Sequence, residues 1–438
     1  MDPRISAEQI FMAGIESVLP DKLIGDHVVI RGSTLLISSL RFPLDTVDRI
    51  FVIGAGKACA LMAKEIENIL GDRIAEGHVV VKYAHACALK YITLTEAGHP
   101  VPDNNGHLAT QNILEIAKKA NANDLIICLL SGGGSALLTD FPEDSTVDDI
   151  IIANDLLIKS GADIKEINAV RKHLSQVKGG QLAKAAYPAF LVSLILSDVI
   201  GDPLDVIASG PTVPDPTTFE DAIRVLRKYD LFSVLPRSLV HHLKKGVAAL
   251  CPETPKPGDP VFNKTTNIII GNNKIMLNAA SKKAFELGLP PLLITTELEG
   301  DTIKLAQCVV AKALHFQKDR SSRKPCCLLF SGESTLKVSG KGTGGRNQHL
   351  ALYAALLLTN HPGITLLAGG TDGSDGPTPV AGAIVNSDTT KYAESIGMPI
   401  QNYLKNFDSF YFFSKVGGQL ITGPTKTNVM DLIVIIIE

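Results

Sequence analysis

Residues 49–58 read RIFVIGAGKA, and this stretch decides the fold class because an apolar strand runs directly into a glycine-containing turn. Residues 57–70 then carry apolar side chains at helical spacing, so a strand, a turn and a helix follow one another. Further apolar strand-like runs, separated by helix-like segments, lie at 77–82, 124–130 and 190–196. Strands that are apolar on both faces are typical of mostly parallel sheets covered by helices. The sequence therefore predicts an α/β fold.

The size and charge of the chain limit its organisation and its partners. Its 438 residues exceed one typical domain, so we expect two domains. A hydrophobic fraction of 45% and a charged fraction of 20% are ordinary for a packed globular protein. The formal net charge of −3 gives no general attraction to nucleic acid or to anionic lipid, so any anion-binding site must be local.

Neither the termini nor the cysteines indicate secretion or membrane insertion. The first residues, MDPRIS, contain no apolar core of the kind found in signal peptides, and the apolar run at 432–437 is far shorter than a membrane span. That run instead predicts a buried strand. The seven cysteines include no CxxC pair, which argues against structural zinc and against a disulfide framework. We expect a cytoplasmic protein with reduced thiols and no nucleic-acid or membrane partner, and a homodimer stays open.

A proline-rich stretch at residues 251–260, CPETPKPGDP, predicts the boundary between the two domains. Its four prolines exclude a helix or a central strand. We therefore expect an N-terminal α/β domain over residues 1–255 and a C-terminal α/β domain over residues 262–438, whose structure starts near Asn267.

The two halves share three short motifs in the same order, which raises the hypothesis of an internal duplication. Residues 53–57 (IGAGK) correspond to 270–274 (IGNNK), and residues 130–135 (LSGGGS) correspond to 330–334 (FSGES). Residues 197–203 (SDVIGDP) correspond to 371–377 (TDGSDGP). A strand followed by glycine occurs in any α/β unit, so these matches alone leave the duplication open.

The first candidate anion site is the turn that contains Gly54, Gly56 and Lys57. The glycines permit a tight turn, and a lysine in the first turn of the following helix adds a full charge to the helix dipole, which suits phosphate. The turn lacks the spacing and the Ser or Thr of a Walker A loop. It also lacks the third glycine of a dinucleotide fingerprint, and the next strand ends in Lys82 rather than in an acid. The simpler alternative is a glycine turn followed by a surface lysine.

The second candidate site is the loop formed by Ser131, Gly132, Gly133, Gly134 and Ser135. It follows the apolar strand at 124–130, and open α/β sheets bind ligands at the carboxyl ends of their strands. Its glycine N–H groups and serine hydroxyls suit phosphoryl oxygens. The loop does not have the G-x-S-x-G pattern of serine hydrolases. A flexible loop without a ligand is the alternative.

The third candidate site lies at residues 341–349, KGTGGRNQH, which open a predicted helix that extends through Leu358. Arg346 would stand at the start of this helix and face the same anion as the N–H groups of Gly344 and Gly345. We also assign the adjacent Asn347 to nucleotide binding. The planar donor fork of an arginine suits carboxylate or phosphate. The alternative is an arginine that only caps the helix at the surface.

Two acids follow apolar strands directly and are candidate catalytic or metal-binding groups. Asp198 comes after the strand at 190–196, and Asp372 lies in the segment GGTDGSDG at 369–376. Either carboxylate could hold Mg²⁺ or accept a proton from a substrate hydroxyl. The nearby Asp202 and Asp375 are as well explained by turn formation.

A basic segment at residues 171–180, RKHLSQVKGG, supplies a further candidate. We assign Lys178 to cofactor binding because, with Lys172, it forms a basic cluster beside a glycine pair. A solvated helix end explains the same segment equally well. His99, in the proline turn at residues 96–100, is a weaker candidate for a supporting role.

The candidate sites belong to a set of motifs that runs in order along nearly the whole chain. The motifs are GAGKA (54–58), EAGHPVPD (96–103), LSGGGSALL (130–138), KGG (178–180), SDVIGDPLDVIASGPT (197–212), GKGTGGRNQ (340–348), GTDGSDGPTPVAGA (370–383) and TGPTKTNVMDL (422–432). Together they resemble the class II glycerate kinases, the glycerate 2-kinases whose C-terminal part is called the MOFRL domain. Each motif alone is weak, but the ordered set is specific.

The resemblance implies an activity and a set of roles. Members of that family phosphorylate the 2-hydroxyl of D-glycerate with ATP and Mg²⁺, giving 2-phosphoglycerate. The resemblance also implies two Rossmann-like α/β domains that flank an active-site cleft, with the family's catalytic lysine and arginine at Lys57 and Arg346. We expect these cations to neutralise the transferred phosphoryl group and the glycerate carboxylate, and residues 131–135 to cradle phosphates or substrate. Asp198 or Asp372 would bind Mg²⁺ or take the hydroxyl proton.

Two other functions stay open at this point. A hydroxypyruvate reductase would bind NAD(P)H, but the incomplete dinucleotide fingerprint argues against it. A non-catalytic sugar-phosphate-binding protein would need the phosphate loops, but it would not need both cations and a pair of acids.

Overall fold

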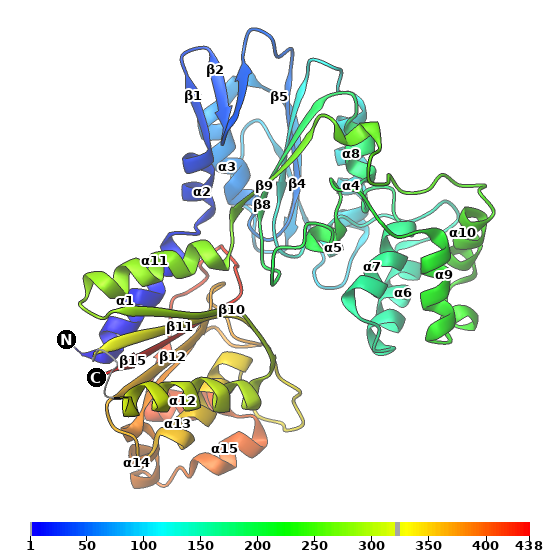
Figure 1. The fold of residues 1–438 in the computed structure, drawn as a ribbon. Helices are drawn as coiled ribbons and strands as arrows, with labels where there is room; N and C mark the ends of the chain where they lie inside the picture. Colours follow the sequence, from blue (N-terminus) through cyan, green and yellow to red (C-terminus); the bar gives the residue numbers. More distant parts are fainter. Residues whose placement is uncertain (1, 320–324) are drawn as a thin grey trace. The chain divides into compact units, whose positions relative to one another are not determined.

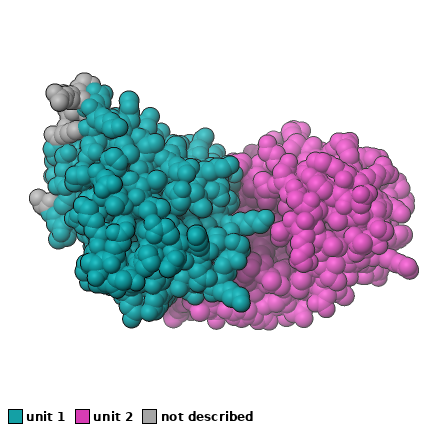
Figure 2. Space-filling view, turned by 90° about the horizontal axis from the view of Figure 1, so that it is seen from below, with its two compact units in different colours: residues 1–19, 198–201, 271–438 teal, residues 20–197, 202–270 magenta. Residues whose placement is uncertain are grey.

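The computed structural model describes residues 2–319 and 325–438, which form two compact units. Unit 1 consists of Met1–Leu19, Asp198–Gly201 and Gly271–Glu438, and unit 2 consists of Pro20–Ser197 and Asp202–Ile270. Figure 1 traces the chain through both units, and Figure 2 distinguishes their surfaces by colour. The chain passes from one unit to the other at 19–20, 197–198, 201–202 and 270–271, so neither unit is a single continuous segment.

Unit 2 is built around a six-stranded sheet in which β4 to β8 run parallel. Its strands are β4 (Ile50–Ala55), β5 (Ile74–Lys82), β6 (Thr93–Ala97), β7 (Leu125–Leu130), β8 (Phe190–Leu196) and β9 (Thr265–Gly271), in the order β6-β5-β4-β7-β8-β9 across the sheet. β4 and β7 are apolar and buried along their whole length, as expected of central strands that are covered on both faces.

Helices cover both faces of this sheet and form a separate cluster beside it (Figure 1). α3 (Cys59–Leu70), with α2 (Pro20–His27) packed on it, covers one face, whereas α4 (Asn104–Lys118) and α8 (Gln181–Ala186) pack together on the other. The cluster consists of α6 (Val147–Lys159), α7 (Ile164–His173), α9 (Phe219–Lys228) and α10 (Arg237–Val247), which share their own apolar core. Capping boxes at Thr146, Asp163 and Thr218 fix the starts of α6, α7 and α9. A short helix, α5 (Gly134–Leu137), and a small antiparallel sheet of β1 (Val28–Arg31), β2 (Thr34–Ile37) and β3 (Leu40–Pro43) complete the unit.

Unit 1 contains a second six-stranded sheet, of mixed direction. Its strands are β10 (Pro291–Asp301), β11 (Cys326–Thr335), β12 (Ile364–Gly370), β13 (Gly382–Asn386), β14 (Gln419–Leu420) and β15 (Asp431–Ile437), in the order β10-β11-β15-β12-β13-β14. β10 and β11 pair in parallel, and the other described ladders of this sheet are antiparallel.

Helices also cover both faces of the unit 1 sheet (Figure 1). α1 (Pro3–Glu16) and α11 (Asn273–Glu286) pack together on one face, and α12 (Thr302–Lys318) and α13 (Arg346–Leu358) cover the other. α14 (Ser387–Ser395), α15 (Ile400–Asn406) and α16 (Ser409–Val416) pack around α13. The core of unit 1 therefore lies mainly between α12, α13 and the sheet.

The α/β fold and several element bounds predicted from the sequence are confirmed. β8 and α13 have the predicted ends, and the apolar run at 432–437 forms most of β15. These elements were predictable because an uninterrupted apolar run or a regular helical spacing defines each of them.

The cysteines and helices of the described chain agree with an ordinary globular protein. All seven cysteines are free thiols. Within residues 2–319 and 325–438, no helix combines the length and the apolar character that a membrane crossing requires.

The prediction of mostly parallel sheets is wrong for unit 1. β15 lies between β11 and β12 and runs antiparallel to both. Its residues 432–437 are all apolar and buried. A strand that is buried on both faces carries the same apolar pattern whichever way it runs, so the pattern contains no information on direction.

The predicted domain ranges 1–255 and 262–438 differ from the two units at their ends. α1 belongs to unit 1, where it packs against α11, β12 and β15. β9 contains Asn267 and joins the sheet of unit 2, so the second long segment of unit 1 starts at Gly271. The sequences of α1 and β9 predict a helix and a strand, but they do not indicate which sheet the helix covers or the strand extends.

The proline-rich stretch at 251–260 lies within unit 2 instead of separating two domains. The N–H of Asp215 donates to the carbonyl oxygen of Pro255 at 2.9 Å, and its carboxylate accepts a hydrogen bond from the Thr254 hydroxyl at 3.0 Å. The prolines therefore mark an irregular segment, which is held against the unit by these bonds.

The arrangement of the strands does not support an internal duplication. β9, which contains Ile270 and Gly271 of the segment matched to residues 53–57, lies in the same sheet as β4. Residues 330–334, which were matched to the loop at 130–135, lie within β11. The matches therefore reflect the strand-and-glycine pattern that α/β units share.

α1 should contribute strongly to the stability of unit 1. Phe11 is fully buried, and a Cβ placed on Gly369 of β12 would lie 2.9 Å from its ring. We expect Phe11→Ala to lower the free energy of unfolding of unit 1 by about 3–5 kcal/mol, because it removes a buried ring and leaves a cavity. Urea unfolding followed by circular dichroism measures this loss. The control, Ile5→Ala at a position of α1 that is 50% exposed, should cost under about 1 kcal/mol, and equal losses would contradict this packing.

Candidate active site

The loops after β4 and β7 meet at the carboxyl edge of the unit 2 sheet. Ala55 pairs with Leu130 at the ends of these parallel strands. The N–H of Lys57 donates to the carbonyl oxygen of Gly132 at 2.9 Å, and the N–H of Ser131 donates to that of Ala55 at 3.2 Å. Two of the candidate anion sites are therefore parts of one hydrogen-bonded structure.

Ser131 holds the start of α3. It is buried, and its Oγ accepts a hydrogen bond at 3.1 Å from the N–H of Ala58, the residue before the helix. A Cβ on Gly56 would collide with this hydroxyl, so glycine is required there. The helix begins at Cys59, so the prediction that Lys57 lies in its first turn is wrong. The hydroxyl of Ser131 therefore accepts the hydrogen bond from the N–H of Ala58 that an external anion could otherwise accept at this helix start.

The glycine loop keeps main-chain donors available. No described residue accepts a hydrogen bond from the N–H of Gly132 or Gly133. The hydroxyl of Ser135, by contrast, lies 2.7 Å from Oγ of Ser209, which donates to Oδ1 of Asn168 at 3.1 Å. An anion at this loop would therefore meet main-chain N–H groups before serine hydroxyls.

Lys57 and His99 lie beside this loop. The Lys57 side chain is half-buried, and its ammonium group makes no hydrogen bond or ion pair with a described residue. A Cβ on Gly133 would lie 2.9 Å from Cδ2 and Nε2 of His99 and 3.4 Å from Cγ of Lys57. Burial, and next the charge of Lys57, lowers the pKa of His99 to about 4, so the imidazole is neutral at pH 7. Nδ1 of His99 is buried and has no hydrogen-bond partner among the described residues.

In unit 1, a carboxylate of the protein occupies the start of α13. The helix begins at Arg346, as predicted. Asp375 accepts hydrogen bonds from the N–H groups of Asn347 at 3.0 Å and Gln348 at 2.8 Å. Gly345 permits this approach, because a Cβ there would collide with the Asp375 carboxylate. The anion expected at this helix start is therefore supplied by the chain itself.

The guanidinium group of Arg346 is held by two further carboxylates. Nε and Nη2 donate to the two oxygens of Asp431 at 2.7 and 3.0 Å, and Nη1 donates to Glu333. Burial opposes the charge, but Asp431 and Glu333 outweigh it and raise the pKa of Arg346. These bonds use three of the roughly five N–H donors of an arginine, so two stay available on a side chain that is 32% exposed.

Asn347 and Asp431 form the buried base of this second site. Nδ2 of Asn347 donates to Asp431 at 3.0 Å and also lies 3.4 Å from Asp375. Burial raises the pKa of Asp431 to about 6, although Arg346 and Asn347 oppose that shift. The amide nitrogen of Asn347 donates to carboxylates of the protein. It therefore helps to hold Asp431 and Asp375 in position and is not available to a nucleotide.

The two predicted metal-binding acids both belong to unit 1. Asp198 follows β8, and its carboxylate accepts a hydrogen bond at 3.4 Å from Nδ2 of Asn428. Asp372 accepts hydrogen bonds from the N–H and the hydroxyl of Ser374 at 3.0 and 3.1 Å. Among the described residues, no group of three or more His, Cys, Asp or Glu side chains is arranged to hold a metal ion. A metal ion here would need ligands from the substrate as well as from the protein.

Three other predicted site residues hold positions in the framework. Lys178 is buried and donates to the carbonyl oxygen of Leu138 and, at 3.4 Å, to Asp140. Burial lowers the pKa of Lys178. Gly54 lies inside β4, and Gly344 packs closely against α16. These residues support the neighbouring loops. The ammonium group of Lys178 is used by Leu138 and Asp140, so it has no open position for a ligand.

Sequence reasoning missed Glu333 and Asp431 and gave little weight to Asp375 and His99. Asp431 is a single acid at the start of an otherwise apolar strand, and that isolated charge is the signal that could have found it. Its pairing with Arg346 spans 85 residues, so local pattern could not reveal it.

The neutral state of His99 should affect how stability depends on pH. Its pKa is about 4 in the folded protein and about 6.5 in an unfolded chain, so the unfolded state binds this proton first as the pH falls. The folded state consequently loses stability from about pH 6.5 downward. We expect His99→Gln to reduce the loss between pH 7 and pH 5 by up to about 2 kcal/mol. Urea unfolding midpoints of both proteins at the two pH values measure the difference.

His241→Gln removes an exposed histidine from the same unit and serves as the control. It should leave the native pH dependence in place. A pH dependence of His99→Gln that matches the native one would contradict the neutral, buried state of His99.

Known proteins with similar sequences match nearly the full length of this chain. Residues 6–244 match a family described as a domain of unknown function (DUF4147), and residues 326–431 match the MOFRL family. The chain is 41% identical to D-glycerate 2-kinase of Thermotoga maritima, over 98% of this chain and 97% of the relative. It is 39% identical to glycerate 2-kinase of Pyrococcus horikoshii, over 100% of this chain and 98% of the relative. A relative from Agrobacterium vitis, 39% identical over 89% of this chain and 87% of its own, carries the provisional name hydroxypyruvate reductase.

Solved structures agree with the sequence comparison. The crystal structure of glycerate kinase from Thermotoga maritima matches with a TM-score of 0.88 and 40% identity over 99% of both chains. The crystal structure of a protein from Pyrococcus horikoshii matches with a TM-score of 0.87 and 38% identity, over 100% of this chain and 99% of that one. The chain therefore belongs to the glycerate 2-kinase family and carries its MOFRL domain in the C-terminal half.

Proposed function

We propose that this protein transfers the γ-phosphoryl group of ATP to the 2-hydroxyl group of D-glycerate, giving 2-phosphoglycerate and ADP. The names of its relatives support this activity. The structural observation that carries the proposal is the ammonium group of Lys57, which lies beside the N–H groups of Gly132 and Gly133; within residues 2–319 and 325–438 none of these three groups has a partner. A cation and main-chain donors at one loop suit a phosphate group.

In this proposal, Lys57 and the glycine loop stabilise the charge that moves during phosphoryl transfer. The 2-hydroxyl oxygen forms a bond to the γ-phosphorus, and the bond from that phosphorus to the oxygen of ADP breaks. Lys57 and the N–H groups would neutralise the charge on the transferred group and the leaving oxygen. His99 is neutral, so it adds a hydrogen-bonding group without a competing charge.

Arg346 is proposed to bind the carboxylate of D-glycerate. Its two remaining N–H donors can meet a carboxylate, which an arginine recognises better than a lysine does because its donors form a planar fork. Asp431 and Glu333 hold the guanidinium group from the other side, which fixes its direction before the substrate arrives.

Asp198 is proposed to accept the proton of the 2-hydroxyl group or, with Asp372, to provide a carboxylate to Mg²⁺. Mg²⁺ usually binds one or two carboxylates together with substrate phosphates and water. Both acids are half-buried, so each could provide one carboxylate oxygen to an ion whose other ligands are phosphates and water. The ion would supply positive charge to the β- and γ-phosphates of the nucleotide.

The reductase alternative finds little support in the geometry. A dinucleotide would place its pyrophosphate at the start of α3, where Ser131 already accepts the N–H of Ala58. β5 also ends in Lys82, where a ribose-binding acid would be expected.

The cytoplasmic location proposed here rests on the sequence features alone, and a homodimer stays open.

An assay coupled to enolase, without phosphoglycerate mutase, tests the proposed function. Enolase converts 2-phosphoglycerate into phosphoenolpyruvate, which absorbs in the ultraviolet. We expect ADP release and enolase signal together when D-glycerate, ATP and Mg²⁺ are present. ADP release without enolase signal would assign the phosphoryl group to another hydroxyl. Hydroxypyruvate reduction with NAD(P)H and no ADP would favour the reductase, and ligand binding without turnover would favour a non-catalytic protein.

Lys57→Met should reduce activity far more than stability. We expect kcat/KM for ATP to fall by roughly 10²- to 10⁴-fold, because the charge of the transferred group loses its cationic partner. The urea midpoint should change little, since the side chain of Lys57 makes no ion pair or hydrogen bond with a described residue. Lys64→Met, on the helix that follows, is the matched control and should keep native kinetics. Native kinetics in Lys57→Met itself would refute the assignment.

A further inference from the structure

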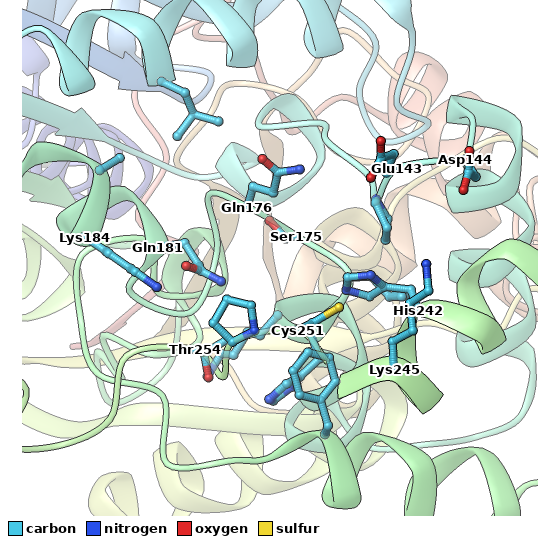
Figure 3. Close-up of a pocket in the computed structure, with 18 of the residues that line it drawn as sticks. Glu143, Asp144, Ser175, Gln176, Gln181, Lys184, His242, Lys245, Cys251 and Thr254 are labelled. Atoms are coloured by element: carbon cyan, nitrogen blue, oxygen red, sulfur yellow. The ribbon is translucent and has the colours of Figure 1, made fainter. Parts of the chain in front are cut away.

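Unit 2 contains a cavity that is not lined by Lys57, His99 or the glycine loop. Its volume of about 700 Å³ lies within the range of small-molecule sites. α8 supplies Gln181 and Lys184 from one side, and α10 supplies His242 and Lys245 from the other (Figure 3). The cavity is therefore large enough for a metabolite and has polar side chains on opposing walls.

Three lysines around this cavity have no partner of opposite charge. The side chains of Lys118 at the end of α4, Lys184 and Lys245 make no ion pair or hydrogen bond with a described residue. The whole chain has a net charge of −3, so this is a local excess of positive charge in a protein with a surplus of carboxylates. Lys118 and Lys184 are exposed and Lys245 is partly buried, so their ammonium groups are accessible to an anion that enters the cavity.

The other charged side chains of the cavity leave this excess in place. Lys172 is buried and is already paired with Asp215 at 3.4 Å. Glu143 and Asp144 also line the cavity, but both are exposed to solvent and neither forms an ion pair with a described residue (Figure 3). Their interaction with the lysines is therefore screened by water.

Neutral groups complete a surface suited to a hydroxylated ligand. The side-chain amides of Gln176 and Gln181 make no hydrogen bond with a described residue, so their donors and acceptors are available. Figure 3 shows Gln181 and Lys184 extending into the same space. Leu114 and Phe219 add apolar area to the lining.

We propose that this cavity binds a small metabolite that carries two separated phosphate groups. Lys184 and Lys245 stand on opposing walls, so each can meet a different phosphate of one ligand. The amides between them suit the hydroxyl groups of a sugar-like body. This ligand site is separate from the site proposed for ATP and D-glycerate.

α7 connects the cavity to the glycine loop. Its last residues, Lys172 and His173, line the cavity. Asn168, about one helical turn earlier, accepts the hydrogen bond from Ser209, whose hydroxyl contacts Ser135. α7 therefore contributes residues both to the cavity and to the hydrogen bonds that hold Ser135 of the glycine loop.

Isothermal titration calorimetry with fructose 1,6-bisphosphate tests the site. This probe has two phosphates separated by a sugar, and the titration uses full-length Lys57→Met protein without other substrates, which weakens binding at the glycine loop. We expect micromolar binding with one ligand per chain. The added double substitution Lys184→Gln and Lys245→Gln should weaken binding by at least tenfold. In the native background the same double variant should keep its basal turnover.

The matched control replaces Lys165 and Lys244 by glutamine, two exposed lysines of the neighbouring helices α7 and α10 that do not line the cavity. It changes the net charge by the same amount and should leave the affinity within about twofold of the parent. Equal weakening in both double variants would mean non-specific attraction and would overturn the proposal. An absence of binding below millimolar concentration would overturn it as well, whatever the outcome of the kinase assay.

Discussion

The hydrogen bonds that join the loops after β4 and β7 are the constraint on which the unit 2 site depends. Lys57 donates its N–H to one loop, and the hydroxyl of Ser131 in that loop accepts the N–H of Ala58. Because Ser131 satisfies the start of α3, the donors left for an anion are the N–H groups of Gly132 and Gly133. A small change in the position of either loop would disturb both the helix start and the donors.

The two units use glycine-rich helix starts in different ways. In unit 2 a neutral hydroxyl meets the helix, and an unpaired lysine stands next to it. In unit 1 the carboxylate of Asp375 meets the helix, and Asp431 and Glu333 surround the adjacent Arg346. Unit 2 therefore offers net positive charge to an anion, whereas unit 1 offers an arginine that two carboxylates hold in a fixed direction. The first arrangement suits phosphate, and the second suits oriented recognition of a small carboxylate.

Local pattern was sufficient for those features that depend on neighbours in the sequence. β8 and α13 follow from an apolar run and a helical spacing, and the place of the 131–135 loop after β7 follows from the apolar strand that precedes it. Pattern was not sufficient where the partner is distant. The direction of β15, the packing of α1 on unit 1 and the pairing of Arg346 with Asp431 all depend on contacts between segments far apart in the chain, and no single segment records them.

Unit 1 is built from segments at both ends of the chain, and this limits the order in which the chain can fold during synthesis. α1 leaves the ribosome before any other element of unit 1, yet it packs on β12 and β15. β15 forms the middle of that sheet and is made more than 400 residues later. Unit 2 can complete its sheet as soon as β9 has emerged, whereas the apolar face of α1 is covered in stages by α11, β12 and β15 and is complete only when residues 431–437 are available. Unit 1 is therefore completed late, and until then α1 exposes apolar surface that could drive aggregation of the unfinished chain.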